Sequence, residues 1–248
     1  MRRQAATGAS ALCELYRRRV LCYRSRMNTT LEALIAPLRH SPQLREVADV
    51  LQEIIRNESE RRGKFYEEMT PDQKIEFIDG EVILHSPAKY KHLGVTKRAL
   101  RLLDTYVDIH QLGEVLCEKC LCVFPRNDYE PDIVFFSKAK ATALLPNTMK
   151  FPIPDLIIEV LSDSTEARDR GVKFEDFQVH GVAEYWILDA EKCVAEQYLL
   201  RDSAYELVLK SSTGELRSET IPGLVIPVKA LFFAEDNLSA LRGMVGDE

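Results

Sequence analysis

Residues 131–136 read PDIVFF and residues 155–161 read DLIIEVL, and these two segments decide the fold of the 248-residue chain. Each is a short apolar run that contains an acidic residue, Asp132 in the first and Glu159 in the second. Apolar runs of this length are typical of strands that are buried on both faces of a sheet. A buried carboxylate is costly unless it is paired or binds a cation, so the two acids indicate a site.

Alternation of side chains along a strand places Glu159 on the same face as Ile157 and turns Ile158 to the other face. If the two strands are neighbours, Asp132 and Glu159 converge at one edge of the sheet. Their carboxylates, the backbone carbonyl of Val160 and several waters would complete an octahedral site for Mg²⁺ or Mn²⁺.

Three further residues are candidates for the chemistry of such a site. Lys173 lies on the following helix, four residues after Asp169, so these two side chains share a helix face. Its ammonium can orient an attacking water or stabilise charge on a phosphate. His92, near the start of an earlier helix, could contact the phosphate. Glu76, in a hairpin before that helix, could supply an additional acid.

The same residues have structural interpretations that spacing alone leaves open. Asp132 can be a turn residue that caps a strand. Glu159 can form a buried salt bridge with Lys173 and hold no metal. Asp169 and Lys173 can be an exposed helix pair, and His92 can be a surface or capping residue.

The rest of the pattern predicts an α/β domain with extra antiparallel hairpins. The turn dipeptide Asp79-Gly80 marks the first hairpin, and Gly181 is expected just after the end of a helix. The predicted elements, in chain order, are a hairpin at 75–84, a helix at 93–113, β-structure at 115–124, strands at 133–136 and 156–161, a helix at 164–180 and strands at 185–188, 194–200, 205–210 and 215–220. The order from residue 93 to residue 188 is therefore helix, three strands, helix, strand.

The domain boundaries follow from changes in composition. Residues 1–60 are expected to be a helical or partly disordered extension, because residues 31–38 and 44–55 carry apolar side chains at helical spacing. An α/β domain is expected at 61–236 and a C-terminal tail at 237–248. The first 26 residues lack the continuous apolar segment of a signal peptide.

The net charge of −6 gives no overall electrostatic support for nucleic-acid binding, so DNA would need a local basic face. The candidate face lies before and along the helix that follows the first hairpin, and it consists of Lys89, Lys91, Lys97, Arg98 and Arg101. No apolar run approaches the roughly 20 residues that span a bilayer, so no membrane partner is expected.

Six cysteines without a secretory signal favour reduced thiols and a cytoplasmic location. The spacing of Cys117, Cys120 and Cys122 is that of a partial zinc or iron–sulfur motif. If residues 115–124 form a regular strand, however, Cys117 and Cys120 face opposite sides and cannot chelate one metal. Buried free thiols are the favoured interpretation.

In combination, these residues resemble the PD-(D/E)XK restriction-endonuclease-like superfamily and, within it, the Uma-type (Uma-two) restriction-endonuclease family. The similarity covers approximately residues 65–233. The matching residues are Ile78-Asp79-Gly80-Glu81, His92, Pro131-Asp132, residues 155–162, Ser164-Thr165, Asp169 with Lys173, Gly181-Val182, Glu184-Tyr185-Trp186 and Asp189. The resemblance implies a core of helix, three strands, helix, strand, with Asp132 and Glu159 as metal ligands.

The sequence departs from the superfamily pattern at one functional position. The superfamily lysine normally follows the second acid by two residues, where this chain has Leu161. The resemblance therefore requires that the lysine has moved to the helix as Lys173, as is typical of the Uma-type family. Phe177 stands where members of that family usually carry tyrosine.

The leading hypothesis is a metal-dependent endonuclease that hydrolyses phosphodiester bonds in DNA. Asp132 and Glu159 would hold Mg²⁺ or Mn²⁺, and Lys173 would position the water, with His92 and Glu76 as helpers. The alternative is a catalytically degenerate nucleic-acid-binding or interaction module on the same fold, which the displaced lysine and the acidic net charge favour. A third interpretation is an interaction protein that assembles through its N-terminal helices. Superfamily members often act as dimers, so a homodimer is a candidate assembly.

Overall fold

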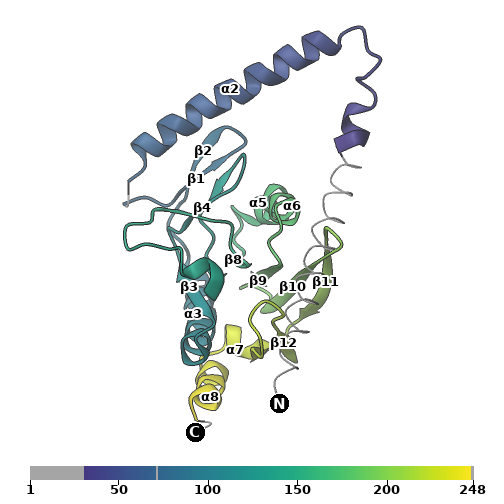
Figure 1. Ribbon diagram of the computed structural model, residues 1–248. Helices are drawn as coiled ribbons and strands as arrows, with labels where there is room; N and C mark the ends of the chain where they lie inside the picture. Colours follow the sequence, from purple (N-terminus) through teal and green to yellow (C-terminus); the bar gives the residue numbers. More distant parts are fainter. Residues whose placement is uncertain (1–30, 71, 247–248) are drawn as a thin grey trace, which may run out of the picture.

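The structure is a computed structural model that describes residues 31–70 and 72–246. A six-stranded sheet lies at its centre. Its strands follow the spatial order β11 (Ala204–Ser211), β10 (Val194–Arg201), β9 (Glu184–Asp189), β8 (Leu156–Val160), β6 (Ile133–Ser137) and β3 (Gly113–Cys117). Strands β8 and β9 are parallel neighbours (Figure 1), and β8 runs antiparallel to β6. All five residues of β8 are buried, as its continuous apolar sequence predicts.

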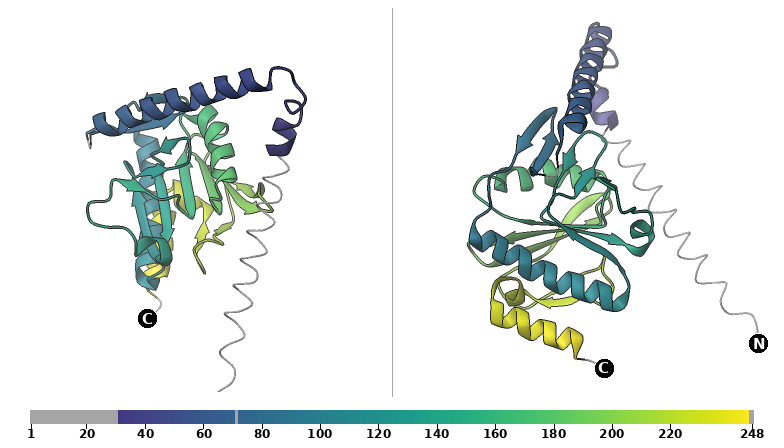
Figure 2. Two further views of the ribbon diagram at one scale, coloured as in Figure 1. Left: turned by 45° about the horizontal axis from the view of Figure 1, so that its top comes forward. Right: turned by 90° about the vertical axis from the view of Figure 1, so that its left-hand side faces the viewer.

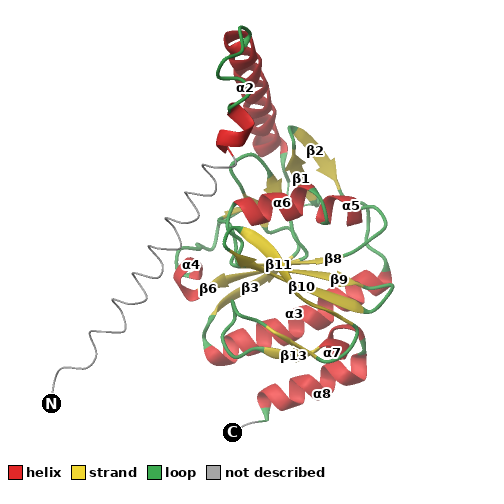
Figure 3. Ribbon diagram, turned by 90° about the vertical axis from the view of Figure 1, so that its right-hand side faces the viewer, coloured by secondary structure: helices red, strands yellow, loops and turns green. Residues whose placement is uncertain are grey.

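Helices cover both faces of this sheet (Figure 3). One face packs against α3 (Tyr90–His110), α7 (Val228–Phe232) and α8 (Ala234–Val245), and the other packs against α5 (Glu166–Asp169) and α6 (Val172–Val179). The apolar residues of the strands alternate between the two cores: Ile158 belongs to the α3 side and Ile157 to the α6 side. The period of two therefore places Glu159 on the α6 side, as its spacing from Ile157 predicts.

A smaller sheet flanks the first and carries the predicted hairpin. Its strands follow the order β2 (Glu81–Leu84), β1 (Ile75–Ile78), β5 (Asp128–Tyr129), β4 (Leu121–Val123) and β7 (Lys150–Phe151). Asp79 and Gly80 join β1 to β2 with φ angles of 51° and 83°, which is the left-handed pair that a two-residue type I′ turn requires. A short helix, α4 (Lys138–Ala141), and a strand pair, β12 (Glu215–Arg217) with β13 (Val225–Pro227), complete the elements.

The predicted order of helix, three strands, helix, strand is confirmed. In the larger sheet it is formed by α3, β3, β6, β8, the α5–α6 pair and β9. The strands of the smaller sheet are insertions into this order, since β4 and β5 lie between β3 and β6, and β7 lies between β6 and β8. The α/β core is therefore the one that the sequence predicts, with the extra antiparallel hairpins of β1–β2 and β10–β11.

The β-structure expected at residues 115–124 is two strands in two different sheets. Strand β3 ends at Cys117, the φ angles of Glu118 and Lys119 are 47° and 52°, and β4 begins in the smaller sheet. The premise of a regular strand was therefore wrong. Cys117 is exposed, whereas Cys120 and Cys122 are buried, and all three are free thiols.

The expected helix at 164–180 is divided in two. Helices α5 and α6 are separated at Gly171, whose φ and ψ angles of −109° and −108° are not helical. Asp169 ends α5 and Lys173 lies in the first turn of α6, and both are buried, with 1% and 2% of the residue exposed. An exposed helix pair is therefore excluded. The C-cap of α6 is His180, and Gly181 follows it at φ 82°, as predicted.

The segments at the two ends of the domain differ from expectation. Helix α2 (Leu44–Glu68) runs through the expected boundary at residue 60 and projects from the body of the molecule (Figure 2). Its second half is attached, because the Arg62 guanidinium lies 2.6 Å from the carboxylate of Asp128. The expected C-terminal tail at 237–248 is instead largely helix α8, and Asn237 within it is fully buried. Residues 1–30, including Cys13 and Cys22, lie outside the described residues.

None of the helices in the two described ranges has both the length and the apolar character that a bilayer crossing requires.

Candidate active site

The structure brings Asp132 and Glu159 together at the α6 face of the central sheet. Ile133 of β6 pairs with Ile158 of β8 in antiparallel register, so Asp132, one residue earlier, lies opposite Glu159. The backbone N–H of Asp132 points to a Glu159 carboxylate oxygen at 3.4 Å. Both residues are buried, with 5% and 3% of their surface exposed. Adjacent strands thus produce the convergence that alternation predicts.

The carboxylate of Asp132 is fixed on both of its oxygens. Oδ2 accepts the backbone N–H of Val160 at 2.9 Å and lies 3.3 Å from His92 Nε2. Oδ1 accepts Lys74 Nζ at 2.9 Å. Burial opposes ionisation of this acid, but the hydrogen bond from His92 and the charge of Lys74 outweigh it, so the pKa of Asp132 is lowered and the residue is an anion.

Lys173 lies at the centre of the remaining acids. Its Nζ is 2.8 Å from Glu159 Oε1, 2.8 Å from Glu76 Oε1 and 3.5 Å from Asp169 Oδ1. Burial disfavours an ammonium, but the three carboxylates outweigh that effect and raise the pKa of Lys173 well above its usual range. Its side chain is 2% exposed, so this charge is held inside the protein.

Glu76 reaches the site from the small sheet. It lies on β1, fully buried, and accepts the Glu130 backbone N–H at 3.0 Å as well as His85 Nε2 at 2.9 Å. Burial raises the pKa of Glu76, but Lys173 and His85 outweigh burial and lower it to about 2. Glu76 is therefore an anion near neutral pH, and it is a second carboxylate 2.8 Å from Lys173 Nζ.

Acidic side chains outnumber lysines in this cluster. Its buried carboxylates are Glu76, Asp132, Glu159 and Asp169, and its lysines are Lys74 and Lys173. Burial and the neighbouring acids raise the pKa of Glu159 to about 8, in spite of the Lys173 contact. Asp169 Oδ1 is buried and has no hydrogen-bond partner among the described residues. The cluster is thus short of positive charge and of donors.

The donor set fits a hard divalent cation only if part of the coordination shell comes from elsewhere. Within residues 31–70 and 72–246, no group of three or more Asp, Glu, His or Cys side chains has the arrangement of a metal site. Mg²⁺ commonly binds through one or two carboxylates and keeps several waters. Asp132 and Glu159 satisfy that smaller requirement, and the excess of carboxylates supplies the matching charge.

Sequence reasoning missed Lys74 and His85. Lys74 lies two residues before Glu76, and the period of two along an extended chain would have placed it on the same face. His85 follows β2 and reaches Glu76 only because the hairpin folds back. Asp169 was part of the family resemblance, but it was expected on a helix face and is in fact a member of the buried cluster.

The expected basic face is largely committed to other contacts. Arg98 Nε donates to the carbonyl of Leu231 in α7, and the Arg101 guanidinium donates to Asn237 in α8. Lys89 pairs with Asp163, and Lys91 pairs with Glu191. Two of the five basic residues therefore serve to attach the C-terminal helices, and two others form surface ion pairs.

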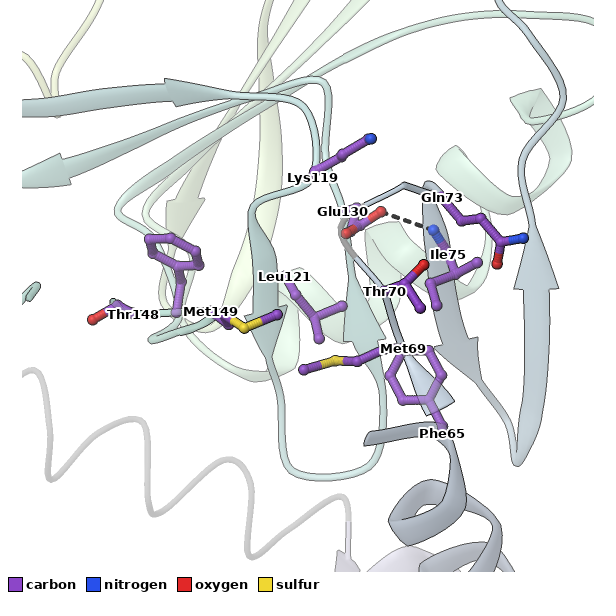
Figure 4. Close-up of a pocket in the computed structure, with 11 residues that line it drawn as sticks. Phe65, Met69, Thr70, Gln73, Ile75, Lys119, Leu121, Glu130, Thr148 and Met149 are labelled. Atoms are coloured by element: carbon purple, nitrogen blue, oxygen red, sulfur yellow. Dashed lines mark hydrogen bonds between the residues drawn. The ribbon is translucent and has the colours of Figure 1, made fainter. Parts of the chain in front are cut away.

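A cavity of about 210 Å³ lies on the other side of β1 (Figure 4). Ile75 lines this cavity, whereas Glu76, the next residue on the strand, contacts Lys173. The apolar residues of the wall include Phe65, Met69 and Leu121. The cavity and the acidic cluster are therefore on opposite faces of the small sheet, and the candidate site is not in the cavity.

Comparisons with known proteins place the chain in a family. A crystal structure of a putative nuclease belonging to DUF820 from Anabaena variabilis superposes with a TM-score of 0.59, at 19% sequence identity, over 71% of this chain and 96% of that one. At that identity the likeness shows a shared fold. No curated protein matches the sequence. Residues 64–229, two thirds of the chain, match the Uma2 family, described as "Putative restriction endonuclease", and the chain therefore belongs to that family.

Proposed function

We propose that this chain is an endonuclease that hydrolyses phosphodiester bonds in DNA with the help of Mg²⁺ or Mn²⁺. The observation that carries the proposal is the meeting of Asp132 and Glu159 across β6 and β8, with Lys173 Nζ 2.8 Å from Glu159. Two carboxylates and a lysine in this arrangement are the groups that phosphodiester hydrolysis requires. Membership of a restriction-endonuclease family supports the same reaction.

Asp132, Glu159 and the backbone carbonyl of Val160 would hold the cation. When bound, such a cation polarises the phosphoryl group and makes a water more acidic. The protein prepares the ligands in advance, because the Val160 N–H and His92 fix one oxygen of Asp132 and Lys173 fixes one oxygen of Glu159. Preset orientation of this kind lowers the cost of reaching the transition state.

Glu76 and Asp169 act through Lys173 in this proposal. They hold its ammonium between them and Glu159, so that it stays charged and in place. In the reaction itself, a water oxygen bonds to phosphorus and gives up a proton, the bond from phosphorus to one deoxyribose oxygen breaks, and that oxygen takes up a proton. The products are a phosphate monoester and a free hydroxyl, and the net change consumes one water.

Cleavage of supercoiled plasmid tests the proposal. The purified full chain is incubated with Mg²⁺, with Mn²⁺ or with EDTA, and the same arms are run on a single-stranded RNA. The wild type is expected to cleave DNA only in the metal arms, and Glu159→Gln is expected to be slower by at least about 100-fold. Glu215→Gln, an exposed glutamate on β12, is the matched control and should cleave as the wild type does. Equal cleavage by Glu159→Gln and the wild type would remove Glu159 from the mechanism.

One observation favours the alternative of a catalytically degenerate module. Each candidate ligand already has a lysine partner, Asp132 with Lys74 and Glu159 with Lys173, as a closed structural network would have. Calorimetric titration with Mn²⁺ separates the two functions. The endonuclease should bind Mn²⁺ with heat that disappears in Asp132→Asn, whereas a degenerate module should show no such heat.

The homodimer remains a prediction of the same proposal. Helix α2 exposes a stripe of apolar side chains along its first half, which consists of Leu44, Val50, Leu51, Ile54 and Ile55. Light scattering of the full chain and of the variant Leu51→Glu with Ile54→Glu would show whether assembly depends on this stripe. A mass that is the same for both proteins would exclude α2 as the dimer contact.

A further inference from the structure

The two lysines of the acidic cluster differ in their access to a substrate. The Lys173 side chain is 2% exposed and has three carboxylates around its Nζ. Two of these acids, Glu76 and Glu159, lie 2.8 Å from Nζ, and Asp169 lies 3.5 Å away, so the Lys173 ammonium is enclosed by the protein's own carboxylates. The Lys74 side chain is 24% exposed, and Asp132 is the acid that it contacts within the described part of the chain. Lys74 therefore keeps donor capacity on the side that faces solvent.

The position of Lys74 is fixed by its backbone. Its carbonyl accepts the backbone N–H of His85 at 3.1 Å, which closes the open end of the β1–β2 hairpin. The next residue, Ile75, donates its N–H to the carboxylate of Glu130 at 2.8 Å, and this bond is the dashed line in Figure 4. The lysine thus extends from an anchored strand end, two residues before Glu76 on the same face.

Lys74 also binds the oxygen of Asp132 that Val160 and His92 leave free. Oδ2 of that carboxylate is held by Val160 and His92, whereas Oδ1 is held by Lys74. A phosphate that comes from solvent reaches the cluster where its side chains are exposed, and the Lys74 side chain is 24% exposed against 2% for Lys173. A phosphate in that place meets the Lys74 ammonium before it meets Lys173.

We propose that Lys74 is a catalytic residue that donates to the scissile phosphate, and that Lys173 is a positioning residue for Glu159. This inference rests on the proposed endonuclease function and assigns the two charges to different tasks. Lys74 forms no covalent bond and transfers no proton in this role. It supplies a positive charge and N–H donors to a non-bridging oxygen, where negative charge grows as water attacks.

The experiment uses the full chain as Lys74→Met, Lys74→Arg, Lys173→Met and Lys229→Met, the last being an exposed lysine on α7 that serves as the matched control. Steady-state cleavage of a DNA duplex in Mg²⁺ gives kcat and KM. Fluorescence anisotropy in EDTA gives the affinity for the same duplex as a function of salt. Thermal unfolding shows whether each variant is folded.

Lys74→Met is expected to fold and to lower kcat by about 100-fold, which is the loss typical of one donor to the transition state. The slope of its log affinity against log salt concentration should be less steep than that of the wild type by about one, because one phosphate contact is lost. Lys74→Arg should recover most of the affinity and part of the rate. Lys173→Met should keep the salt slope of the wild type, and Lys229→Met should keep both slope and rate.

Wild-type kcat and wild-type salt slope in Lys74→Met, beside an inactive Glu159→Gln, would overturn the inference and leave the endonuclease proposal standing. A wild type that cleaves no DNA with either metal would overturn the endonuclease proposal, and the catalytic role of Lys74 with it. The salt slope would still decide whether Lys74 meets a phosphate.

Discussion

Two buried glutamates on neighbouring parallel strands, Glu184 on β9 and Glu159 on β8, are stabilised in opposite ways. Glu184 is fully buried and accepts hydrogen bonds from five neutral donors. These donors are Trp186 Nε1 and Gln197 Nε2 on one oxygen, and Ser218 Oγ with the backbone N–H groups of Glu219 and Thr220 on the other. Glu159 instead depends on the charge of Lys173 and lies among three other acids.

The difference separates an acid whose oxygens are fully satisfied from an acid that an added cation would stabilise. A carboxylate with both oxygens satisfied by neutral donors has nothing to gain from a cation, and its donors tie β9 to the loop after β12. A carboxylate that is surrounded by other acidic side chains is stabilised by any added positive charge. Burial alone did not distinguish the two residues. The groups that contact each carboxylate distinguish them: neutral donors surround Glu184, whereas a lysine and other acids surround Glu159.

The largest expected effect comes from Lys173→Met in the absence of metal. Removal of the ammonium leaves Glu76, Glu159 and Asp169 buried without their shared cation, and loss of one partner from a buried ion pair costs roughly 3–5 kcal/mol. Urea unfolding of the variant and the wild type in EDTA measures the loss. An unchanged midpoint would show that the cluster does not need this charge for folding, which would weaken the contrast with Glu184.

The second effect is expected from Glu184→Gln. The amide cannot accept from all five donors, and each buried donor left unsatisfied costs about 1–3 kcal/mol. The free energy of unfolding should fall accordingly, while the nuclease rate per folded molecule should match that of the wild type. A variant that is stable but inactive would place Glu184 in the site and break the comparison.

A third acid, Glu196 on β10, sharpens the comparison through pH. Burial opposes its ionisation, but hydrogen bonds from Arg170, Tyr198 and Lys210 outweigh it and lower the pKa of Glu196 to about 2 from 4.5. A carboxyl group whose pKa is lower in the folded state than in the unfolded state stabilises the protein at pH values above its unfolded pKa. This stabilisation is lost as the pH falls through the folded pKa. Wild type should therefore exceed Glu196→Gln in unfolding free energy by roughly 1–3 kcal/mol at pH 7, and the gap should close between pH 4.5 and pH 2. A difference in unfolding free energy that is the same at pH 7 and at pH 2 would mean that the ionisation of Glu196 does not contribute to stability.

The smallest effect on stability is expected from Glu159→Gln. The variant loses part of a contact to Lys173 but also replaces a carboxyl group whose ionisation burial and the neighbouring acids oppose. The two changes nearly cancel, and unfolding in EDTA should shift by less than about 1 kcal/mol. The two variants should thus have opposite effects: Glu184→Gln should lose stability and keep cleavage, whereas Glu159→Gln should keep stability and lose cleavage. Equal losses of stability in both would contradict this pairing.

Local sequence patterns predicted the strands, the Asp79-Gly80 turn and the core order, because these depend on neighbouring residues. The alternation around Glu159 also placed it on the correct face. The same patterns could not show the break after Cys117, since Glu118 and Lys119 adopt left-handed φ angles without the Gly or Asn that usually marks them.

The rest of the site could not be predicted because it depends on contacts between distant segments. Lys74 and His85 reach the acids only after the small sheet docks beside β6, and no local signal encodes that docking. The sequence predicts a tail where the structure has helix α8, because the attachment of this helix depends on Asn237, which donates to the carbonyls of Arg98 and Ala230. Such contacts become visible only in three dimensions.

The attachment of α2 determines how short a working fragment can be. Arg62 binds the fully buried carboxylate of Asp128 and the carbonyls of Phe124, Pro125 and Asn127, and so supports the turn that leads into the chain segment of Asp132. The family match starts at residue 64, two residues too late to include this arginine. A fragment cut at that boundary would leave the buried carboxylate of Asp128 without its arginine partner, four residues before Asp132. The smallest fragment that keeps this contact therefore begins upstream of the family match, inside α2.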